Sequence, residues 1–345
     1  MHRLTSLVAA SAAAVGSSIA ALSASVADPV AEFYNGKSIV LLIGFGPGGG
    51  YDSYARVLAR HLGKHLPGQP NVIPQNMPGA GGLAVANFLY HVAPADGLTL
   101  GVFGPFNALE PLFGNPGARF DPTKLTWIGK MDADAGACGA WRGSGIRQFS
   151  DLQHKEVVFG SSGRASTTTQ QVLALKNMLG AKVKIVQGYK GSADITLAMR
   201  RGEVSAMCGI AASNVLAQLK DDVKNGDIRI FIQFGRTNAP EFGNAENIYE
   251  LLSTSEEREV AEIIFRPNEL GKPVAAPPGL PADRAKALRD AFTSTMANPG
   301  FLAEMSRMNL PVNTATGEEV ARVLASLYAR PRPLIDRAVA NMTNE

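Results

Sequence analysis

The sequence predicts an α/β fold built from open, mostly parallel sheets. Short apolar runs alternate with helical patterns along most of the chain, as expected for successive strand–helix units. Two glycine-rich loops each stand between a predicted strand and a predicted helix, a common arrangement in parallel sheets. With 345 residues, of which 46% are hydrophobic, the chain is long enough and apolar enough to form two packed domains.

The first series of elements covers residues 38–103. An apolar run at 38–44 predicts a buried strand. The glycine-rich loop after it leads into a helix at 52–66, with Ala55, Leu58 and Leu62 on one face. Two further strands are predicted, with a helix ending at about His91 between them; these strands are at 71–75 and 98–103.

A second series of elements begins at Trp127. Its predicted strands lie near 156–160, 183–189, 204–208 and 228–234. Its predicted helices lie near 167–179, 193–200 and 213–224. The tail returns to long helices, at 281–297, 317–328 and 333–341.

The N-terminus has the pattern of a secretory signal at residues 1–27. His2 and Arg3 precede a stretch rich in alanine, valine, leucine and serine, and small residues at Ser25 and Ala27 form a cleavage site. The apolar stretch is too short and too rich in serine and alanine for a good membrane span, although an uncleaved anchor is the alternative. We therefore expect the mature protein to be exported to the periplasm.

Composition and spacing exclude several classes of function. The net charge is only +3 and no basic block is present, so a nucleic-acid partner is not expected. His61 and His65 stand four residues apart, but Leu62 occupies the place of the glutamate of a metalloprotease helix, so no metal is predicted. The stretch 160–164 breaks the spacing of a serine-hydrolase nucleophile elbow.

The two cysteines, Cys138 and Cys208, are 70 residues apart in the second series. In an oxidising compartment they can pair, which would tie two segments of one domain together. Two free buried thiols are the alternative, and the sequence leaves both open.

The first glycine-rich loop, at 44–49, matches the dinucleotide-binding pattern G-x-G-x-x-G. That site needs an acidic residue about 20 positions later to hold a ribose hydroxyl, and no Asp or Glu occurs between Asp52 and Asp96. We therefore predict no cofactor. The backbone N–H groups of residues 47–51 and the helix that follows instead predict a cradle for an anion, with Asp52 in the first helical turn.

A second glycine-rich loop, at 78–82, repeats this arrangement one strand–helix unit later. Because both loops follow strand ends, we expect them to face one crevice. The alternative is that these glycines only form tight turns.

The second series carries polar candidates in equivalent positions. Hydroxyls at 161, 162, 166 and 167 lie between a strand end and a helix start, where they either cap the helix or reach a ligand. Tyr189 closes a strand and can contact the ligand, whereas Lys190 has solvation as its simpler explanation. Arg164 is placed to bind a second carboxylate through two hydrogen bonds, or else is a surface arginine.

The sequence resembles the solute-binding proteins of tripartite tricarboxylate transporters, the TctC/Bug type. The resemblance extends from residue 33 to residue 328. It is carried, in the family's order, by LLIGFGPGGGYDSYARVLARHL, NMPGAGGLAVANFL, APADGLTLGVF, VVFGSSGRASTTTQQ, VQGYKGSADITLAMRRGEVSAM and APPGLPADRAKALRDAF.

This resemblance implies a two-lobe periplasmic binding protein, or Venus flytrap, joined by two hinge strands. Lobe 1 would be discontinuous, 33–131 plus 237–345, and lobe 2 would cover 132–236. A ligand between the lobes would be held by Phe45, Pro47, Gly48, Gly49, Gly50, Tyr51, Asp52, Gly79, Ala80, Gly81, Gly82, Ser161, Ser162, Arg164, Ser166, Thr167, Tyr189, Lys190 and Gly191.

The implied function is capture of a small organic carboxylate, of the di- or tricarboxylate type, and its delivery to membrane transporter subunits. No reaction would be catalysed, and the protein would be a monomer. The stretch 202–209 lacks the aspartates that the family often carries there, which favours carboxylates over amino acids as ligands. A secreted α/β enzyme, hydrolase-like and using the same cleft, is the alternative.

Overall fold

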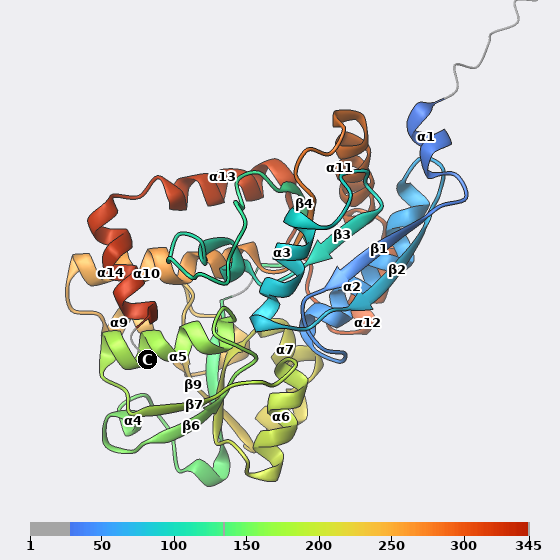
Figure 1. Cartoon of the computed structure of the whole chain (residues 1–345). Coiled ribbons are helices and arrows are strands. Elements are labelled where there is room, and N and C mark those ends of the chain that lie inside the picture. The colour runs from blue at the N-terminus through green and yellow to red at the C-terminus, as the bar shows by residue number, and fades with distance from the viewer. Residues whose placement is uncertain (1–27, 134, 344–345) are drawn as a thin grey trace, which may run out of the picture.

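The chain folds into two α/β halves, each built around a six-stranded sheet (Figure 1). The computed structural model describes residues 28–133 and 135–343. Sheet A has the strand order β12-β4-β11-β3-β1-β2, and sheet B has the order β10-β9-β5-β8-β6-β7. The α/β class with two lobes is confirmed, whereas the predicted signal at 1–27 lies outside the part of the chain that the structure describes.

Each sheet draws its strands from separate parts of the chain. Sheet A consists of β1 (Ser38–Ile43), β2 (Asn71–Asn76), β3 (Thr99–Val102), β4 (Thr126–Lys130), β11 (Pro273–Ala276) and β12 (Ala315–Thr316). Sheet B consists of β5 (Ala137–Trp141), β6 (Val157–Gly160), β7 (Val183–Val186), β8 (Ala206–Ile210), β9 (Ile228–Gln233) and β10 (Glu246–Asn247).

The helices of the first half of the chain are α1 (Pro29–Tyr34), α2 (Gly50–Leu62), α3 (Leu83–His91), α4 (Asp151–His154), α5 (Thr167–Leu179), α6 (Ser192–Arg201), α7 (Ala212–Ala217) and α8 (Lys220–Lys224). Those of the remainder are α9 (Ile248–Leu251), α10 (Ser255–Phe265), α11 (Ala282–Met296), α12 (Pro299–Arg307), α13 (Gly317–Tyr328) and α14 (Arg332–Thr343). The helix predicted at 213–224 is in fact two, α7 and α8, because the backbone leaves the helical conformation at Gln218 and Leu219.

Most strands of each sheet run in one direction, as the sequence predicts, but both sheets also contain antiparallel strands. Strands β2, β1 and β3 are parallel, as are β7, β6 and β8. However, β11 pairs antiparallel with β3 and β4, and β5 pairs antiparallel with β8 and β9. The reason is topological: β5 and β11 are the strands by which the chain enters each sheet from the other half. They therefore begin at the edge where the strands of the strand–helix units end.

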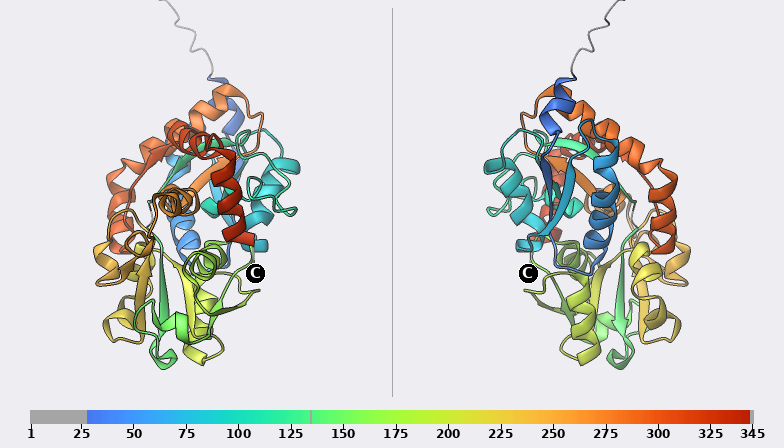
Figure 2. Two further views of the ribbon diagram at one scale, coloured as in Figure 1. Left: turned by 90° about the vertical axis from the view of Figure 1, so that its left-hand side faces the viewer. Right: turned by 90° about the vertical axis from the view of Figure 1, so that its right-hand side faces the viewer.

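Helices cover both faces of each sheet. In the sheet A half, Leu41 packs with Leu58 of α2 and Phe292 of α11, while Phe103 packs with Leu89 of α3 on the opposite face. The sheet B half is covered by α5, α10 and α14 on one face and by α6 and α7 on the other. Two helix-covered sheets place the strand ends of both halves toward each other (Figure 2).

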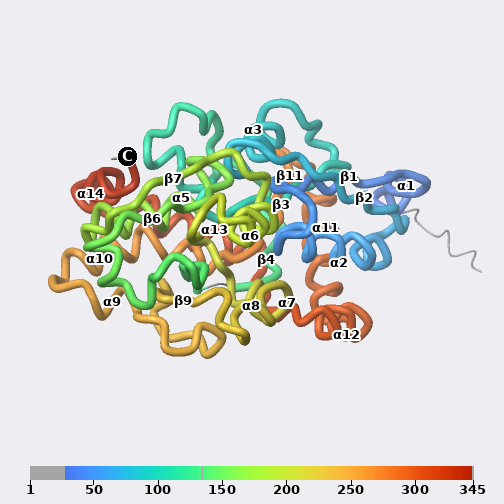
Figure 3. The backbone as a smooth tube through the Cα atoms, turned by 90° about the horizontal axis from the view of Figure 1, so that it is seen from below, coloured from blue at the N-terminus to red at the C-terminus, as the bar shows by residue number. Residues whose placement is uncertain are grey.

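Two later segments of the chain, β10 and α14, belong to the sheet B half. Strand β10 pairs with β9, and α14 packs against both α10 and α5 (Figure 3). Asn177 of α5 donates a hydrogen bond to the carbonyl of Asn341, and Arg337 forms an ion pair with Glu256. The tail that follows Tyr328 thus ties the two halves together, although the lobe boundaries, 33–131 plus 237–345 and 132–236, stay a prediction.

A disulfide joins Cys138 of β5 to Cys208 of β8, in the core of the sheet B half. It links two neighbouring strands of one sheet, so it leaves the two halves free to move relative to each other. No helix within residues 28–133 and 135–343 is long and apolar enough to cross a membrane.

Removing this disulfide is expected to destabilise the protein. Replacing both cysteines by alanine should lower the free energy of unfolding by about 4 kcal/mol, because the bond closes a loop of about 70 residues in the unfolded chain. Urea denaturation measures this loss. Alkylation of the unfolded, unreduced protein should add no label to either cysteine, and two labels would contradict the pairing.

Candidate ligand-binding site

A narrow cleft lies between the two sheets. Its wall comes from both halves of the chain and from the connections between them. The lining residues are Phe45, Gly49, Gly50, Tyr51, Pro105, Gly136, Ser162, Ser166, Thr167, Thr168, Gly191, Ser192, Gly209, Ala211, Asn214, Asn268, Gly271 and Lys272.

Three helices begin at this cleft. The first residues of α2, α5 and α6 are Gly50, Thr167 and Ser192, and all three line it. The first N–H groups of a helix have no partner within the helix, and the helix dipole places a partial positive charge at that end. Three such ends at one cleft favour an anion through backbone groups alone.

The formal charge in the wall is also positive, like the partial charge at the helix ends. Among the lining residues, Lys272 is the one with a formal charge, and none is an aspartate or glutamate. The remaining polar groups are hydroxyls and side-chain amides. The wall therefore offers hydrogen-bond donors and one cation to a ligand, and no carboxylate to hold a ligand ammonium group.

The first glycine loop is held in place from behind by Asp52. Its carboxylate accepts hydrogen bonds from the Gly48 N–H at 2.9 Å, from Arg56 Nε at 2.9 Å and from Asn76 Nδ2 at 2.8 Å. Burial acts to raise the pKa of the Asp52 carboxyl, but hydrogen bonds from Arg56, Gly48 and Asn76 outweigh it, and the pKa lies below its usual value. Asp52 thus shapes the loop and does not line the cleft.

The second glycine loop contacts the other half of the protein. A Cβ atom on Gly81 would lie 2.6 Å from the Ser166 nitrogen, so this residue has room for hydrogen alone. The buried Asn107 donates to the carbonyls of Gly81 at 3.2 Å and Ala165 at 2.9 Å, which joins the loop to the start of α5. The loop therefore positions the α5 end of the cleft.

The structure brings only some of the predicted site residues to the cleft wall. Those that line it are Phe45, Gly49, Gly50, Tyr51, Ser162, Ser166, Thr167 and Gly191. Those that do not are Pro47, Gly48, Asp52, Gly79, Ala80, Gly81, Gly82, Ser161, Arg164, Tyr189 and Lys190. Their role in ligand binding stays a prediction, and of the predicted glycine cradle at 47–51 it is residues 49–51 that line the wall.

Several of the residues outside the wall have structural contacts instead. Ser161 is buried and hydrogen-bonded to Thr169, and Arg164 is exposed. Lys190 contributes its carbonyl, which accepts a 2.7 Å hydrogen bond from the Gly46 N–H. This last bond joins the first glycine loop directly to the sheet B half.

Sequence reasoning missed ten lining residues: Pro105, Gly136, Thr168, Ser192, Gly209, Ala211, Asn214, Asn268, Gly271 and Lys272. Thr168 and Ser192 adjoin predicted site residues, so a wider window around each loop would have included them. Asn268 and Lys272 lie in a connection between the halves, where no local pattern in the sequence marks them.

No group of three histidine, cysteine or acidic side chains suitable for a metal ion is found in the part of the chain that the structure describes. His61 lies 2.8 Å from Glu304, which Arg60 also contacts. His61 therefore takes part in a polar contact between α2 and α12.

Comparison with known families matches residues 54–339 to the model described as "Tripartite tricarboxylate transporter family receptor". The chain belongs to this family. A family relative from Cupriavidus necator, the "UPF0065 protein in gbd 5'region", is 25% identical over 96% of this chain and 94% of its own length. The resemblance seen in the sequence is confirmed.

Several solved structures share the fold of this chain. The periplasmic binding protein BugD has a TM-score of 0.71 and 17% identity, over 89% of this chain and 98% of its own. MatC from Rhodopseudomonas palustris, solved with bound malate, has a TM-score of 0.68 and 17% identity over 89% and 99%. An R. palustris protein solved with adipate has a TM-score of 0.67 and 19% identity, over 88% of this chain and 98% of its own.

A buried carboxyl lies near the cleft of this TctC-family chain. Glu110 accepts a 2.8 Å hydrogen bond from Gln170 Nε2 of α5, so it joins the segment that carries Pro105 to the other half. Burial raises its pKa to about 7, although Asn115, the charge of Arg164, and Gln170 act to lower it.

Stability should therefore depend on pH through Glu110. The native protein keeps the proton up to about pH 7, whereas the unfolded chain releases it near 4.5, so stability is lost as the pH rises through this interval. Glu110→Gln removes the effect and should gain up to about 3 kcal/mol over the wild type between pH 4.5 and pH 8. Urea denaturation across this range tests it, with the exposed Glu259→Gln as control; a constant difference would contradict it.

Proposed function

We propose that this protein is a periplasmic solute-binding protein that captures a small organic carboxylate in the cleft between its lobes. It then delivers the ligand to the membrane subunits of a tripartite tricarboxylate-type transporter, acting as a monomer. The observation that carries the proposal is the convergence of α2, α5 and α6 on a wall without carboxylates. Such a wall favours anions over cations and zwitterions.

Closure of the lobes around the ligand would provide the signal for delivery. A ligand that touches both halves stabilises the closed form, because its contacts are complete only when the cleft is shut. Contacts between the halves support this, since Gly46 bonds Lys190 and Asn107 bonds Ala165. Malate and adipate, the ligands in two relatives with this fold, supply the class of ligand to test first.

A hydrolase using the same cleft is less well supported. The hydroxyls of Ser162, Ser166 and Thr167 line the wall, but no lining residue is a histidine, aspartate or glutamate that would serve as a general base. The Ser162 Oγ atom lies 3.3 Å from Thr168 Oγ1, so its neighbour there is a second hydroxyl and not a general base.

A thermal-shift panel tests the proposed function. The mature protein is heated with carboxylates, amino acids, sugars and nucleotides in turn. A ligand at 100 times its dissociation constant adds about 2.7 kcal/mol to the stability, which raises the melting temperature of a chain this size by several degrees. Shifts confined to carboxylates are expected, and shifts with sugars or nucleotides alone would refute the proposal.

Gly49→Asp should abolish carboxylate binding while the protein still folds. Gly49 precedes α2 in extended backbone, where aspartate is a favourable helix cap, but its side chain would add negative charge and bulk beside Ser192. Titration calorimetry measures the loss. Gly143→Asp, at an exposed glycine outside the cleft wall, is the matched control and should bind as the wild type does. Equal affinity in both variants would place the ligand elsewhere.

A further inference from the structure

We propose that Lys272 and Asn268 form a second anion subsite in the cleft, and that Lys272 makes the protein select ligands with two carboxylates. The inference rests on the proposed function, since it assumes that an organic carboxylate occupies the cleft. Both residues belong to the connection from the sheet B half to β11, and both line the cleft.

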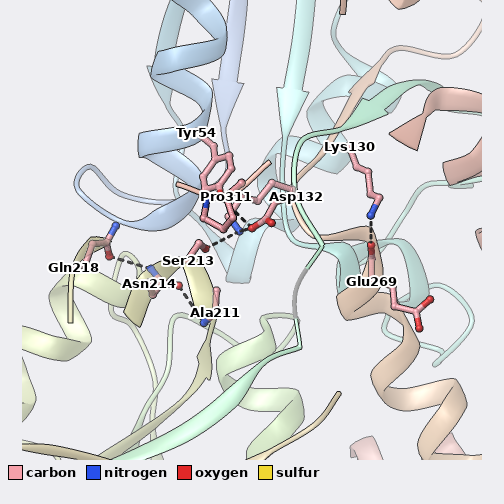
Figure 4. Close-up of polar contacts among 10 residues, drawn as sticks. Tyr54, Lys130, Asp132, Ala211, Ser213, Asn214, Gln218, Glu269 and Pro311 are labelled. Atoms are coloured by element: carbon pink, nitrogen blue, oxygen red, sulfur yellow. Dashed lines mark hydrogen bonds and ion pairs between the residues drawn. The ribbon is translucent and has the colours of Figure 1, made fainter. Parts of the chain in front are cut away.

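Lys272 is a cation fixed in position within the wall. Its side chain is almost fully buried, and Nζ lies 2.7 Å from Asp132 Oδ2 and 3.3 Å from Ser213 Oγ. The Tyr54 hydroxyl also donates to Asp132, at 3.1 Å. Figure 4 shows Tyr54, Asp132 and Ser213 gathered where the two halves meet. An ammonium held this way is already ordered and dehydrated. A ligand carboxylate can therefore bind it without a further loss of side-chain entropy.

Asn268 adds a donor that the protein leaves unused. Its side chain is 4% exposed, and its Nδ2 atom has no hydrogen-bond partner among the residues that the structure describes. A buried amide without a hydrogen-bond partner destabilises the free protein. A ligand oxygen atom that accepts this hydrogen bond would remove the penalty. An unpartnered donor in a cleft wall points to a ligand.

The subsite lies beside the helix end that the first glycine loop presents. A Cβ atom on Gly50 would lie 3.6 Å from Lys272 Cε and 3.2 Å from the Asn214 side chain. The lack of a side chain at Gly50 therefore lets Lys272 and Asn214 approach the N-terminus of α2. One carboxylate of the ligand would thus meet the Lys272 ammonium and the N-terminus of α2. The other carboxylate would meet the N-termini of α5 and α6.

The Asp132 partner tunes this subsite. Without it, a lone buried ammonium would be costly in the free protein and would bind any anion. With it, the ammonium stays charged in the buried wall, and that charge attracts a ligand carboxylate more strongly than a neutral amide, although Asp132 offsets part of the attraction. The cleft would therefore select ligands by the charge of their second group.

The experiment compares malate and adipate with their monoamides, using titration calorimetry at neutral pH. The wild type should bind the better diacid about tenfold or more tightly than its monoamide, because a hydrogen bond to a charged group is the stronger one. Lys272→Met alone would strand the Asp132 carboxylate, so the test variant is Asp132→Asn with Lys272→Met. In it, the ratio of the two affinities should fall to about one.

Two further variants separate binding from folding. Asn268→Leu removes the unpartnered amide, so stability should be unchanged or higher while diacid affinity falls severalfold. Lys130→Met is the matched control, because Lys130 is also buried, bonds the Glu269 carbonyl and does not line the cleft; its affinity ratio should equal that of the wild type.

The outcomes distinguish this inference from the proposed function. A wild type that binds a diacid and its monoamide equally, or a double variant that keeps the wild-type ratio, overturns the subsite. So does an Asn268→Leu protein that loses stability and keeps its affinity. A wild type that binds no carboxylate in the panel overturns both the subsite and the proposed function.

Discussion

The structure depends on one constraint, the direction in which its parallel strands run. In each half, the strands of the strand–helix units end at the edge that faces the other half. Each helix that follows such a strand therefore starts at the same edge, and α2, α5 and α6 all begin at the cleft. Partial positive charge thus gathers there through topology, with little help from basic side chains.

Three strands of the described residues run the other way, β5, β11 and β12, and the first two carry the next level of organisation. Because β5 and β11 start at the cleft, the connections that lead into them lie within its wall. Asp132 precedes β5 and Lys272 precedes β11, so their buried ion pair joins the two connections. Breaking such a pair is costly, because it leaves an uncompensated buried charge. The same two side chains thus link the geometry between the halves to the charge of the cleft.

The two glycine loops show how similar sequences take different tasks. The first loop presents Gly49, Gly50 and Tyr51 to the cleft, with the rings of Phe45 and Tyr51 stacked 4.3 Å apart. The second packs against the α5 start, where Gly81 leaves no room for a side chain. A glycine motif announces close approach of a backbone, but whether the neighbour is a ligand or another loop depends on what lies opposite.

The sequence by itself determined the family, the α/β class and most of the long elements. Strand and helix periodicities are local, so α5 and α13 were predicted with their observed bounds, whereas the short strands β5 and β11 were missed. It also predicted eight of the 18 residues of the cleft wall, those that follow a strand or begin a helix. Only the tertiary structure decided that Cys138 meets Cys208, that α14 packs on α5, and that Asn268 and Lys272 enter the wall. These contacts join residues far apart in the chain, and no local pattern encodes which distant surfaces will meet.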